Sequence, residues 1–184
     1  MRVIAGEWRG RKLVAPKGDA TRPTADRTRE TLFSMLTSRL GSFEDLRIAD
    51  LFAGSGALGL EGLSRGAAHC LFVEQDRDAL SSIRANIAAL GCRDRTQVEA
   101  GSVMGLRAAQ EPYDLILADP PYRTEAGEVA FDRLLRLGWI GEATWIALET
   151  AFNEEPEVKG LSVEVSRKVG KARLTLMRAS QTAH

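Results

Sequence analysis

Residues 46–60 constrain the fold of this chain more than any other stretch, because a buried strand, a glycine turn and a helix follow one another there. The apolar run 48–52 predicts the strand. Gly54, Gly56 and Gly59 come next, and leucines at helical spacing continue from them. Glycines let the backbone turn tightly and approach a ligand, and the start of the following helix presents N–H groups without partners. This order predicts a nucleotide-type ligand site where the strand ends.

Glu74 supports this interpretation, since it lies twenty residues beyond Gly54 at the end of a second apolar run, 70–73. A carboxylate in this place can accept hydrogen bonds from both hydroxyls of a ribose. The alternative is a plain glycine turn followed by a solvated acid, and a glycine pattern alone does not exclude it. The turn and the acid together favour the ligand site.

Strand and helix patterns alternate along most of the chain. Apolar stripes at helical spacing, N-cap residues and terminal glycines mark the helices, and short apolar runs mark the strands. The alternation predicts an α/β fold with a mostly parallel sheet, helices on both faces and right-handed crossovers. The expected elements are a helix capped by Thr24 and ended before Gly41, the strand 48–52 with its helix, the strand 70–73, a helix 76–90, the strands 96–100 and 113–118, a helix over about 127–138, the strand 145–148, and a C-terminal antiparallel pair, 161–165 with 173–177.

Asp119, Pro120, Pro121 and Tyr122 follow the fourth predicted strand, so we expect them at the carboxyl edge of the sheet, beside the glycine turn. Ligands bind at that edge in open α/β sheets. Two consecutive prolines fix the backbone and remove two N–H donors, which leaves carbonyls that only accept. Asp119 is a further acceptor, and Tyr122 offers a flat aromatic face. A rigid acceptor pair beneath an aromatic ring suits the exocyclic NH2 group of a planar base; the alternative is a turn that the prolines merely stiffen.

The formal net charge of zero hides a strong asymmetry along the chain. Residues 1–30 carry eight Lys and Arg against four Asp and Glu, and residues 159–184 carry six against one. The intervening residues, 31–158, carry eleven against twenty. Two basic ends around an acidic middle indicate a polyanionic partner, with two solvated basic faces as the plainer alternative.

The N-terminal region 2–14 alternates loosely between apolar and basic residues and is interrupted by glycines, which predicts a small, twisted, basic ribbon. Its cations suit nucleic-acid phosphates, and Trp8 either stacks on a base or packs against the domain. We therefore expect this end of the chain to contact a nucleic acid. The residues assigned to that contact are Arg9, Arg11, Lys12, Arg22 and Arg27.

The length of 184 residues suits one domain, in which residues 1–23 are a basic extension and residues 24–184 the core. A hydrophobic share of 44% is typical of a globular protein. No apolar run approaches the length of a membrane span, and no signal-peptide pattern opens the chain. Cys70 and Cys92 lack metal-ligand spacing and are expected to be reduced thiols. We expect a cytoplasmic protein whose partners include neither a membrane nor a metal.

Several stretches resemble one group of enzymes. Residues 50–61, Asp-Leu-Phe-Ala-Gly-Ser-Gly-Ala-Leu-Gly-Leu-Glu, are similar to S-adenosylmethionine-dependent amino-methyltransferases, as are Val-Glu-Gln-Asp at 73–76 and Asp-Pro-Pro-Tyr at 119–122. Residues 4–13, Ile-Ala-Gly-Glu-Trp-Arg-Gly-Arg-Lys-Leu, and 22–33, Arg-Pro-Thr-Ala-Asp-Arg-Thr-Arg-Glu-Thr-Leu-Phe, resemble one branch closely. That branch is the bacterial 16S ribosomal RNA guanine-N2 methyltransferase (RsmD) family.

The resemblance spans roughly residues 1–178 and implies a Rossmann-like class I methyltransferase fold with a seven-stranded sheet. It implies S-adenosyl-L-methionine as cofactor and 16S rRNA, within a small-subunit particle, as the substrate that is methylated on a guanine N2 amine. Many relatives place an acid after the third strand to contact the adenine, and this chain has Ser102 there. The implied cofactor residues are Asp50, Phe52, Ala53, Gly54, Ser55, Gly56, Glu74, Gln75, Ser102 and Val103, and the implied catalytic residues are Asp119, Pro120, Pro121 and Tyr122.

Other functions agree with parts of this pattern. DNA adenine-N6 or cytosine-N4 methyltransferases use the same kind of acceptor motif as residues 119–122, but the chain leaves little room for a DNA target-recognition domain. A nicotinamide-dependent reductase shares the glycine turn and Glu74 but gives residues 119–122 no role. A cytosine-C5 methyltransferase needs a nucleophilic cysteine, and neither Cys70 nor Cys92 is near the predicted catalytic edge. Protein glutamine methyltransferases usually have Asn where this chain has Asp119.

Overall fold

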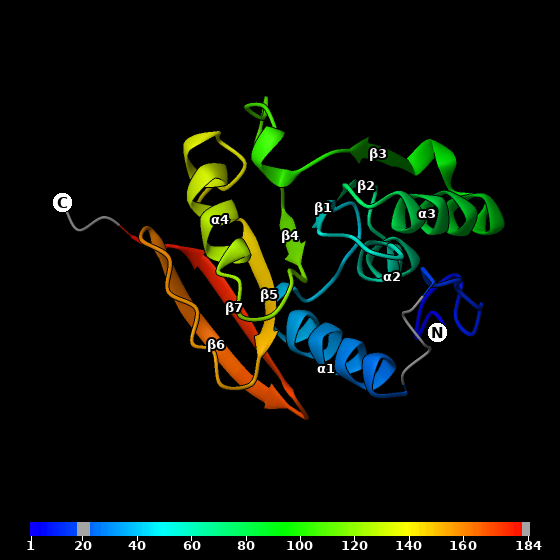
Figure 1. Cartoon of the computed structure of the whole chain (residues 1–184), viewed down its shortest axis with the longest axis horizontal. Helices are drawn as coiled ribbons and strands as arrows, with labels where there is room; N and C mark the ends of the chain where they lie inside the picture. Colours follow the sequence, from blue (N-terminus) through cyan, green and yellow to red (C-terminus); the bar gives the residue numbers. More distant parts are fainter. Residues whose placement is uncertain (18–22, 182–184) are drawn as a thin grey trace.

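A seven-stranded sheet forms the centre of the structure (Figure 1), a computed structural model that describes residues 1–17 and 23–181. The strand order is β3-β2-β1-β4-β5-β7-β6, and only β7 runs antiparallel to its neighbours. The Rossmann-like fold expected from the sequence is confirmed, including the C-terminal antiparallel hairpin. The strands are β1 (Arg47–Leu51), β2 (His69–Glu74), β3 (Thr96–Ala100), β4 (Leu115–Ala118), β5 (Trp145–Ala151), β6 (Leu161–Val169) and β7 (Ala172–Ala179).

Helices cover both faces of the sheet, as the alternating pattern predicts. The apolar side chains of α1, α2 and α3 pack with one face of the sheet into one cluster, and those of α4 pack with the other face into a second. Within the described part of the chain, no helix combines the length and the apolar character that crossing a membrane requires. The helices are α1 (Pro23–Leu40), α2 (Ala57–Ser64), α3 (Arg77–Leu90) and α4 (Ala126–Arg136), with short 3-10 turns η1 (Arg93–Arg95) and η2 (Val103–Gly105).

Most predicted elements lie where the pattern put them, and the differences occur at their ends. α3 begins after Asp76, whose side chain accepts from the Ala79 N–H, and it ends at Gly91 in a left-handed conformation, as expected. β4 starts at Leu115, two residues later than predicted, because the Asp114 carboxylate turns back to accept the Arg47 N–H at the start of β1. β5 runs on through polar residues because its backbone stays paired with β7 as far as its last residue. Backbone pairing of this kind needs no apolar side chain and leaves no signal in the hydrophobic pattern.

Where the sequence predicts a basic ribbon, the chain folds back on itself: one antiparallel bridge joins Arg2 and Lys12, the Val3 N–H donates to the Arg11 carbonyl and the Leu13 N–H donates to the Met1 carbonyl, both at 2.9 Å. Other backbone groups of this segment bond to side chains of α2 and α3. Trp8 is 7% exposed, and the Arg95 guanidinium lies 5.3 Å from the centre of its ring. Trp8 therefore packs against the domain and does not present its ring to a base.

Helix α2 lies so close to the sheet that there is no room for a side chain at Gly59, the third glycine of the turn motif. A Cβ atom added at Gly59 would lie 2.5 Å from Cε1 of Phe72 and 2.6 Å from Sγ of Cys70. One turn later, a Cβ at Gly62 would lie 2.5 Å from Cδ1 of Ile48. Two missing side chains on one face of the helix thus set the distance between α2 and the sheet, and with it the position of the turn that precedes the helix.

We predict that Gly59→Ala destabilises the fold, although alanine is the better helix former. The intrinsic preference for alanine is worth about 1 kcal/mol, whereas the overpacking costs about 1–3 kcal/mol and more where ring and sulfur atoms block the space. Urea unfolding should show a net loss of about 1–2 kcal/mol. Gly101→Ala is the matched control, because a Cβ there meets nothing within 4 Å. An equal effect of the two substitutions would contradict the close-approach explanation.

Candidate active site

The parallel pairing of β1 with β4 brings the two sequence motifs together. In the register of this pair Leu51 lies opposite Ala118, so Phe52 and Asp119 leave neighbouring strands side by side, about 5 Å apart. The expected position of both motifs at one edge of the sheet is confirmed. The strand order also reverses between β1 and β4, since the chain moves from β1 outwards to β3 and then returns to the other side of β1. Such a switch point is where open α/β sheets bind ligands.

The turn after β1 is held in a conformation that bulky residues avoid. Phe52 has a φ of 54°, in the left-handed region, and Gly54 and Gly56 follow at 58° and 82°. A non-glycine residue in this region costs of order 1 kcal/mol and persists only where the surroundings enforce it. The Ala53 N–H donates to the Val73 carbonyl at 3.1 Å, which ties the turn to β2. Strained residues of this kind cluster at ligand-binding and catalytic sites.

Glu74 shapes the same turn from the end of β2. Its Oε1 accepts the Gly54 N–H at 2.8 Å, and its Oε2 accepts the N–H groups of Gln75 and Asp76 at 2.8 and 2.9 Å. A carboxylate has about four acceptor positions, so about one remains for a further donor. The sequence predicts Glu74 as a ligand residue; the structure adds a second role, in which Glu74 holds the glycine turn against the end of β2.

Asp50 is the most strongly perturbed titratable group of the site. It is 1% exposed, and its Oδ2 accepts the Gly59 N–H at 2.9 Å. Burial raises its pKa from 3.8 to about 8; the charge of Glu74 adds to this effect and the Gly59 hydrogen bond opposes it. Its Oδ1 has no hydrogen-bond partner among the described residues. A buried carboxyl oxygen without a donor is costly, and it suits a cationic or hydrogen-bonding group supplied by a ligand.

The remaining predicted cofactor residues flank the turn on the side of β3. Because Glu74 pairs with Ala100, the chain leaves β2 and β3 at the same edge. Gln75 is exposed there, Ser102 caps η2 by accepting the Met104 N–H at 3.1 Å, and Val103 is buried. The structure therefore brings all the predicted cofactor residues to one continuous edge formed by the ends of β1, β2 and β3.

Asp119 and Tyr122 are both exposed at the end of β4. The Tyr122 hydroxyl donates to Oε2 of Glu149 at 2.7 Å, so an acid of β5 fixes the direction of the phenol. Pro120 is buried, and a Cβ at Gly127 of α4 would lie 3.2 Å from its Cγ. Prolines, a helix glycine and an acid of the next strand together hold the motif rigid.

The segment after Tyr122 is also fixed by an acid that sequence analysis missed. Glu154 accepts the Arg123 N–H through Oε1 at 2.8 Å and the Ala151 N–H through Oε2 at 2.6 Å. Arg123 and Glu125 have φ values of 60° and 56°, so this second loop, like the first, contains left-handed non-glycine residues. The available signal was weak: acids in a polar run after a strand look like ordinary solvated residues.

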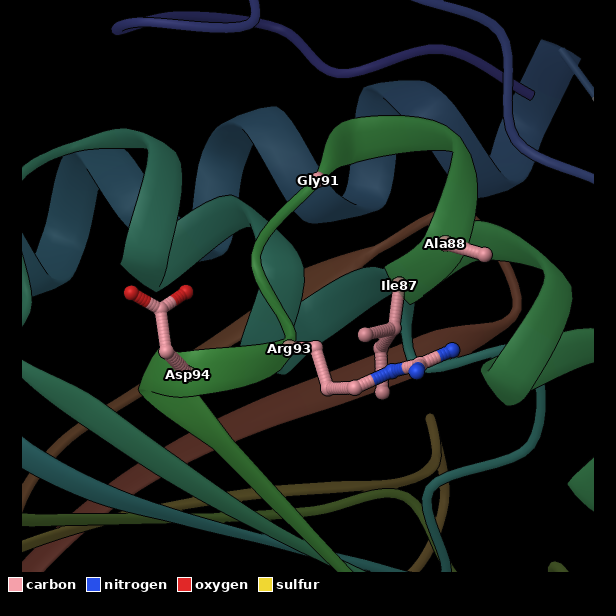
Figure 2. Close-up of a pocket in the computed structure, with 5 residues that line it drawn as sticks. All are labelled: Ile87, Ala88, Gly91, Arg93 and Asp94. Atoms are coloured by element: carbon pink, nitrogen blue, oxygen red, sulfur yellow. The ribbon is translucent and has the colours of Figure 1, made fainter.

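A hollow of about 550 Å³ elsewhere on the molecule does not belong to this site (Figure 2). It lies at the C-terminal end of α3. A helix that begins at the carboxyl edge ends at the opposite edge, from which β3 starts, so the hollow and the motifs occupy opposite edges of the sheet. Its lining residues are Ile87, Ala88, Gly91, Arg93 and Asp94.

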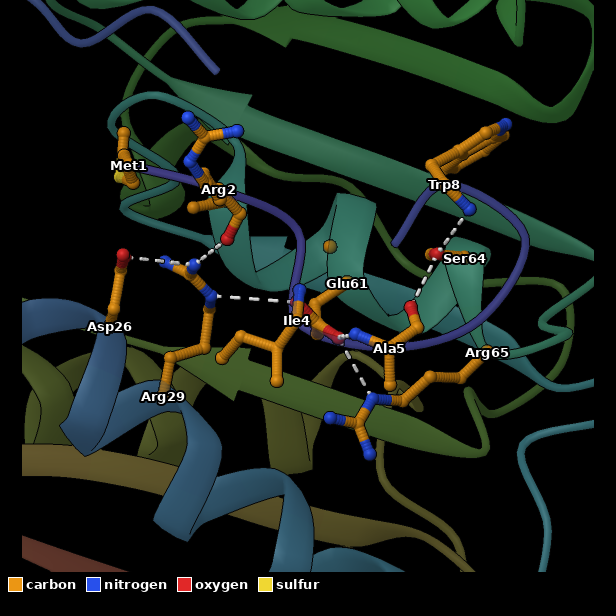
Figure 3. Close-up of polar contacts among 12 residues, drawn as sticks. Met1, Arg2, Ile4, Ala5, Trp8, Asp26, Arg29, Glu61, Ser64 and Arg65 are labelled. Carbon is orange, nitrogen blue, oxygen red and sulfur yellow. Dashed lines mark hydrogen bonds and ion pairs between the residues drawn. The ribbon is translucent and has the colours of Figure 1, made fainter. Parts of the chain in front are cut away.

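The N-terminal segment is docked on α2 through a buried carboxylate (Figure 3). Glu61 is 1% exposed and accepts the Ile4 and Ala5 N–H groups at 2.9 and 3.1 Å. Its carboxylate also pairs with Arg65 at 2.9 Å and with the buried Arg29 of α1 at 3.6 Å. Two cations and two amides thus satisfy one buried charge, and three separate parts of the chain meet there.

Two further polar side chains complete this docking. Ser64 accepts the Trp8 N–H at 3.0 Å and donates to the Ala5 carbonyl at 2.6 Å. Asn86 of α3, 2% exposed, pairs with both backbone groups of Val14 and donates to the Ser55 carbonyl at 2.9 Å. Asn86 therefore connects the N-terminal segment directly to the glycine turn. Its signal in the sequence is a polar residue on the apolar stripe of a helix.

Of the predicted nucleic-acid contacts, Arg9, Arg11 and Lys12 lie in the N-terminal segment and Arg27 lies near the start of α1. Arg9, Arg11, Lys12 and Arg27 are exposed, and Arg22 lies outside the described residues. The Arg11 guanidinium donates to the Ala89 carbonyl at 2.8 Å, near the end of α3 and thus towards the edge opposite the motifs.

Comparison with known proteins gives consistent matches. A family model described as Conserved hypothetical protein 95 matches residues 1–178. Ribosomal RNA small subunit methyltransferase D of Escherichia coli (strain K12) is 38% identical over 150 residues, which are 82% of this chain and 74% of that protein. The protein of the same name from Haemophilus influenzae is 36% identical over 155 residues, 82% of this chain and 78% of its own. The solved structure of the Escherichia coli protein yhhF superposes with a TM-score of 0.84 at 35% identity and covers 97% of both chains.

We predict a pH-dependent cost of burying Asp50. The folded state keeps a proton up to about pH 8 that the unfolded chain releases near pH 3.8, so the free energy of unfolding falls as pH rises between these values. Asp50→Asn accepts from Gly59 without titrating and should remove up to roughly 1.4 kcal/mol per pH unit of this slope. Urea unfolding of the wild-type protein and of Asp50→Asn, from pH 5 to pH 8, measures the difference between the two slopes. Asp94→Asn, an exposed acid, should keep the wild-type slope; equal slopes for all three proteins would contradict the prediction.

We predict that Glu61→Gln strongly destabilises the protein. The substitution removes the buried negative charge that pairs with both Arg65 and Arg29, so that the buried Arg29 keeps, among the described residues, only the partly exposed Asp26 at 3.1 Å as an ion-pair partner, and breaking a buried ion pair from one side costs about 3–5 kcal/mol. Glu7→Gln is the control, since Glu7 also belongs to the N-terminal segment but pairs with Arg95 while 61% exposed, where a pair contributes about 0–1 kcal/mol. Urea unfolding compares the two. If both substitutions cost less than about 1 kcal/mol, Glu61 does not anchor the segment.

Proposed function

The chain belongs to the family described as Conserved hypothetical protein 95, and on this basis we propose that it is an S-adenosylmethionine-dependent methyltransferase of small-subunit ribosomal RNA. We propose further that the methyl acceptor is the exocyclic N2 amine of a guanine. The observation that carries this proposal is the register of β1 with β4, which sets a strained glycine turn beside the acceptor motif that begins at Asp119. The names of the relatives support the substrate class, and the chemistry of the motif supports the amine.

The residues around the turn fit the proposed cofactor. The orphaned Oδ1 of Asp50 suits the ammonium group of its amino acid part, and the remaining acceptor position of Glu74 suits a ribose hydroxyl. Gln75, Ser102 and Val103 would lie beside the adenine. When bound, S-adenosylmethionine supplies a methyl group on a sulfonium, whose leaving group is neutral and needs no acid.

The acceptor motif has to make a poor nucleophile reactive. The lone pair of the guanine amine is delocalised into the ring, which makes the amine a weak nucleophile. Asp119 and the Pro120 carbonyl would accept hydrogen bonds from its two N–H groups and so turn the lone pair towards the methyl group. Positioning of this kind is worth roughly 7–11 kcal/mol, and acceptors aimed at the positive charge that develops on the nitrogen add to it. As the N–C bond forms, the amine loses one proton, for which Asp119 is the acceptor.

Tyr122 would receive the base after it leaves its stack. An aromatic ring replaces part of the lost stacking energy when a nucleotide is extruded into a pocket. The hydrogen bond from Tyr122 to Glu149 holds the phenol in place, so less conformational freedom is lost when the base arrives.

Thermal unfolding with candidate ligands tests the cofactor. S-adenosylmethionine and S-adenosylhomocysteine should raise the Tm; at a hundredfold excess over Kd, the stabilisation is about 2.7 kcal/mol. Stabilisation by NAD(H) and by neither of these two ligands would instead support a reductase. Methylation of a DNA substrate in place of ribosomal RNA would support the related DNA enzymes.

We predict that Asp119→Ala lowers the rate of methyl transfer by about 10²–10³, as the loss of one preorganised group typically does, while S-adenosylhomocysteine binding is retained. Asp119→Asn keeps an acceptor oxygen and should lose less. Asp94→Ala, which removes an exposed acid at the opposite edge, should keep wild-type activity. The measurement is incorporation of labelled methyl into ribosomal RNA from a strain that lacks the gene, with the modified nucleotide identified by mass spectrometry. Wild-type turnover in Asp119→Ala would refute the assigned role.

A further inference from the structure

The tip of the β6–β7 hairpin lies at the same edge of the sheet as the two motifs. Ala172, the first residue of β7, pairs with Ala151, the last residue of β5, and also with Val169 at the end of β6. The turn between β6 and β7 therefore projects beyond the carboxyl end of β5. β5 in turn pairs with β4, which ends in the acceptor motif. Figure 1 shows this tip at the lower end of the hairpin, towards which the arrowheads of β4 and β5 also point.

Three cations gather at this tip. Arg167 and Lys168 are at the end of β6, Lys171 is in the turn, and all three are exposed. Within residues 1–17 and 23–181, no ion pair is formed by any of the three. Arg167 pairs with Leu174 and Lys168 with Arg173, so neighbouring cations of β6 point to opposite faces of the hairpin. The tip thus presents positive charge on both faces.

Two acids that follow β5 have other partners than the three tip cations. Glu155 pairs with Arg173 at 3.9 Å, and Glu154 accepts two backbone N–H groups. Arg173 also donates to Oγ of Ser166 at 2.8 Å and to the Phe152 carbonyl at 3.3 Å, so it braces the tip and does not belong to its free charge.

An exposed aromatic residue adjoins the cations. Phe152 follows β5 directly, is 43% exposed, and its N–H donates to the Lys171 carbonyl at 2.9 Å. This hydrogen bond fixes the aromatic residue beside the tip. Exposed cations beside an exposed ring form the combination with which proteins hold single-stranded nucleic acid, since cations neutralise phosphates and rings stack on bases.

We propose that the β6–β7 tip and Phe152 hold the RNA strand next to the target nucleotide, with Arg167, Lys168 and Lys171 on its phosphates and Phe152 against a base. This inference rests on the proposed function and extends it to the substrate-binding surface. At about 4.8 Å per strand, β7 lies about 10 Å and β6 about 14 Å from β4, a span that a few nucleotides of single strand cover. The tip is thus close enough to act on the strand that enters the Asp119–Tyr122 motif.

The test compares two triple variants that lose the same charge. Arg167→Ala/Lys168→Ala/Lys171→Ala removes the tip cations, and Arg39→Ala/Arg84→Ala/Arg93→Ala removes exposed cations of α1, α3 and η1. The substrate is small-subunit ribosomal RNA, naked or in the particle, from a strain that lacks the gene. The quantities measured are KM and kcat for RNA at several salt concentrations, and the Kd for S-adenosylhomocysteine.

We expect the tip variant to raise the KM for RNA at least about tenfold, and to reduce the slope of log KM against log salt by about 2, since each phosphate contact on a single strand contributes about 0.7. The Kd for S-adenosylhomocysteine should stay unchanged. Phe152→Ala should raise KM at least about fivefold without changing the salt slope, because stacking releases no counterions.

Equal KM values and slopes for the tip and control variants would overturn this inference while leaving the proposed function intact, provided that the wild-type protein methylates the RNA. A wild-type protein that binds S-adenosylhomocysteine but transfers no methyl group to ribosomal RNA would overturn the proposed substrate and this inference with it. An increase in the Kd for S-adenosylhomocysteine in the tip variant would also count against the inference, since the damage would then reach the cofactor site.

Discussion

The parallel pairing of β1 with β4 brings the two halves of the candidate site together. Parallel strands all end at one edge, so whatever follows Leu51 and Ala118 has to meet there. Since the strand order also reverses between these two strands, the crossover helices leave on opposite faces and a crevice remains between them. A strained turn borders one side of this crevice and a proline-stiffened acceptor motif borders the other.

Helix α2 connects the glycine turn with the sheet on one side and with the N-terminal segment on the other. On its inner side, Gly59 and Gly62 let it lie almost against the sheet, which fixes the turn that precedes it. On its outer side, Glu61 and Ser64 bind the N-terminal segment through backbone N–H groups and a carbonyl. The N-terminal segment therefore acts as part of the domain. Together with Asn86 of α3, it supports the glycine turn from behind.

Two buried carboxylates of this domain, Glu61 and Asp50, differ in how completely they are hydrogen-bonded. The Glu61 carboxylate has four partners, which offset the cost of removing a charge from water. Asp50 lacks a full set among the described residues, and its pKa is raised as a result of burial. The contrast separates a structural carboxylate from one that suits a ligand. No contrast of this kind is visible in the hydrophobic pattern, where both residues are acids next to leucines.

The helices, most strands and both motifs could be predicted because each rests on a local signal: apolar periodicity, a cap, a glycine turn or a proline pair. The docking of the N-terminal segment could not be predicted, because its loosely alternating residues do not show that its backbone N–H groups bond to Glu61, Ser64 and Asn86. Glu149 and Glu154 were missed for a related reason. Their partners lie 27 and 31 residues away in the chain, and sequence spacing does not show such contacts.

The sequence by itself determined the α/β class, the order of the elements, the glycine turn with Glu74 and the acceptor motif at Asp119, because each of these depends on residues that are close neighbours in the chain. Only the tertiary structure decided which carboxylates are satisfied, where the N-terminal cations lie, and that the β6–β7 tip shares an edge with the motifs. Those properties depend on strand register and helix packing, which bring together groups that are distant in the chain.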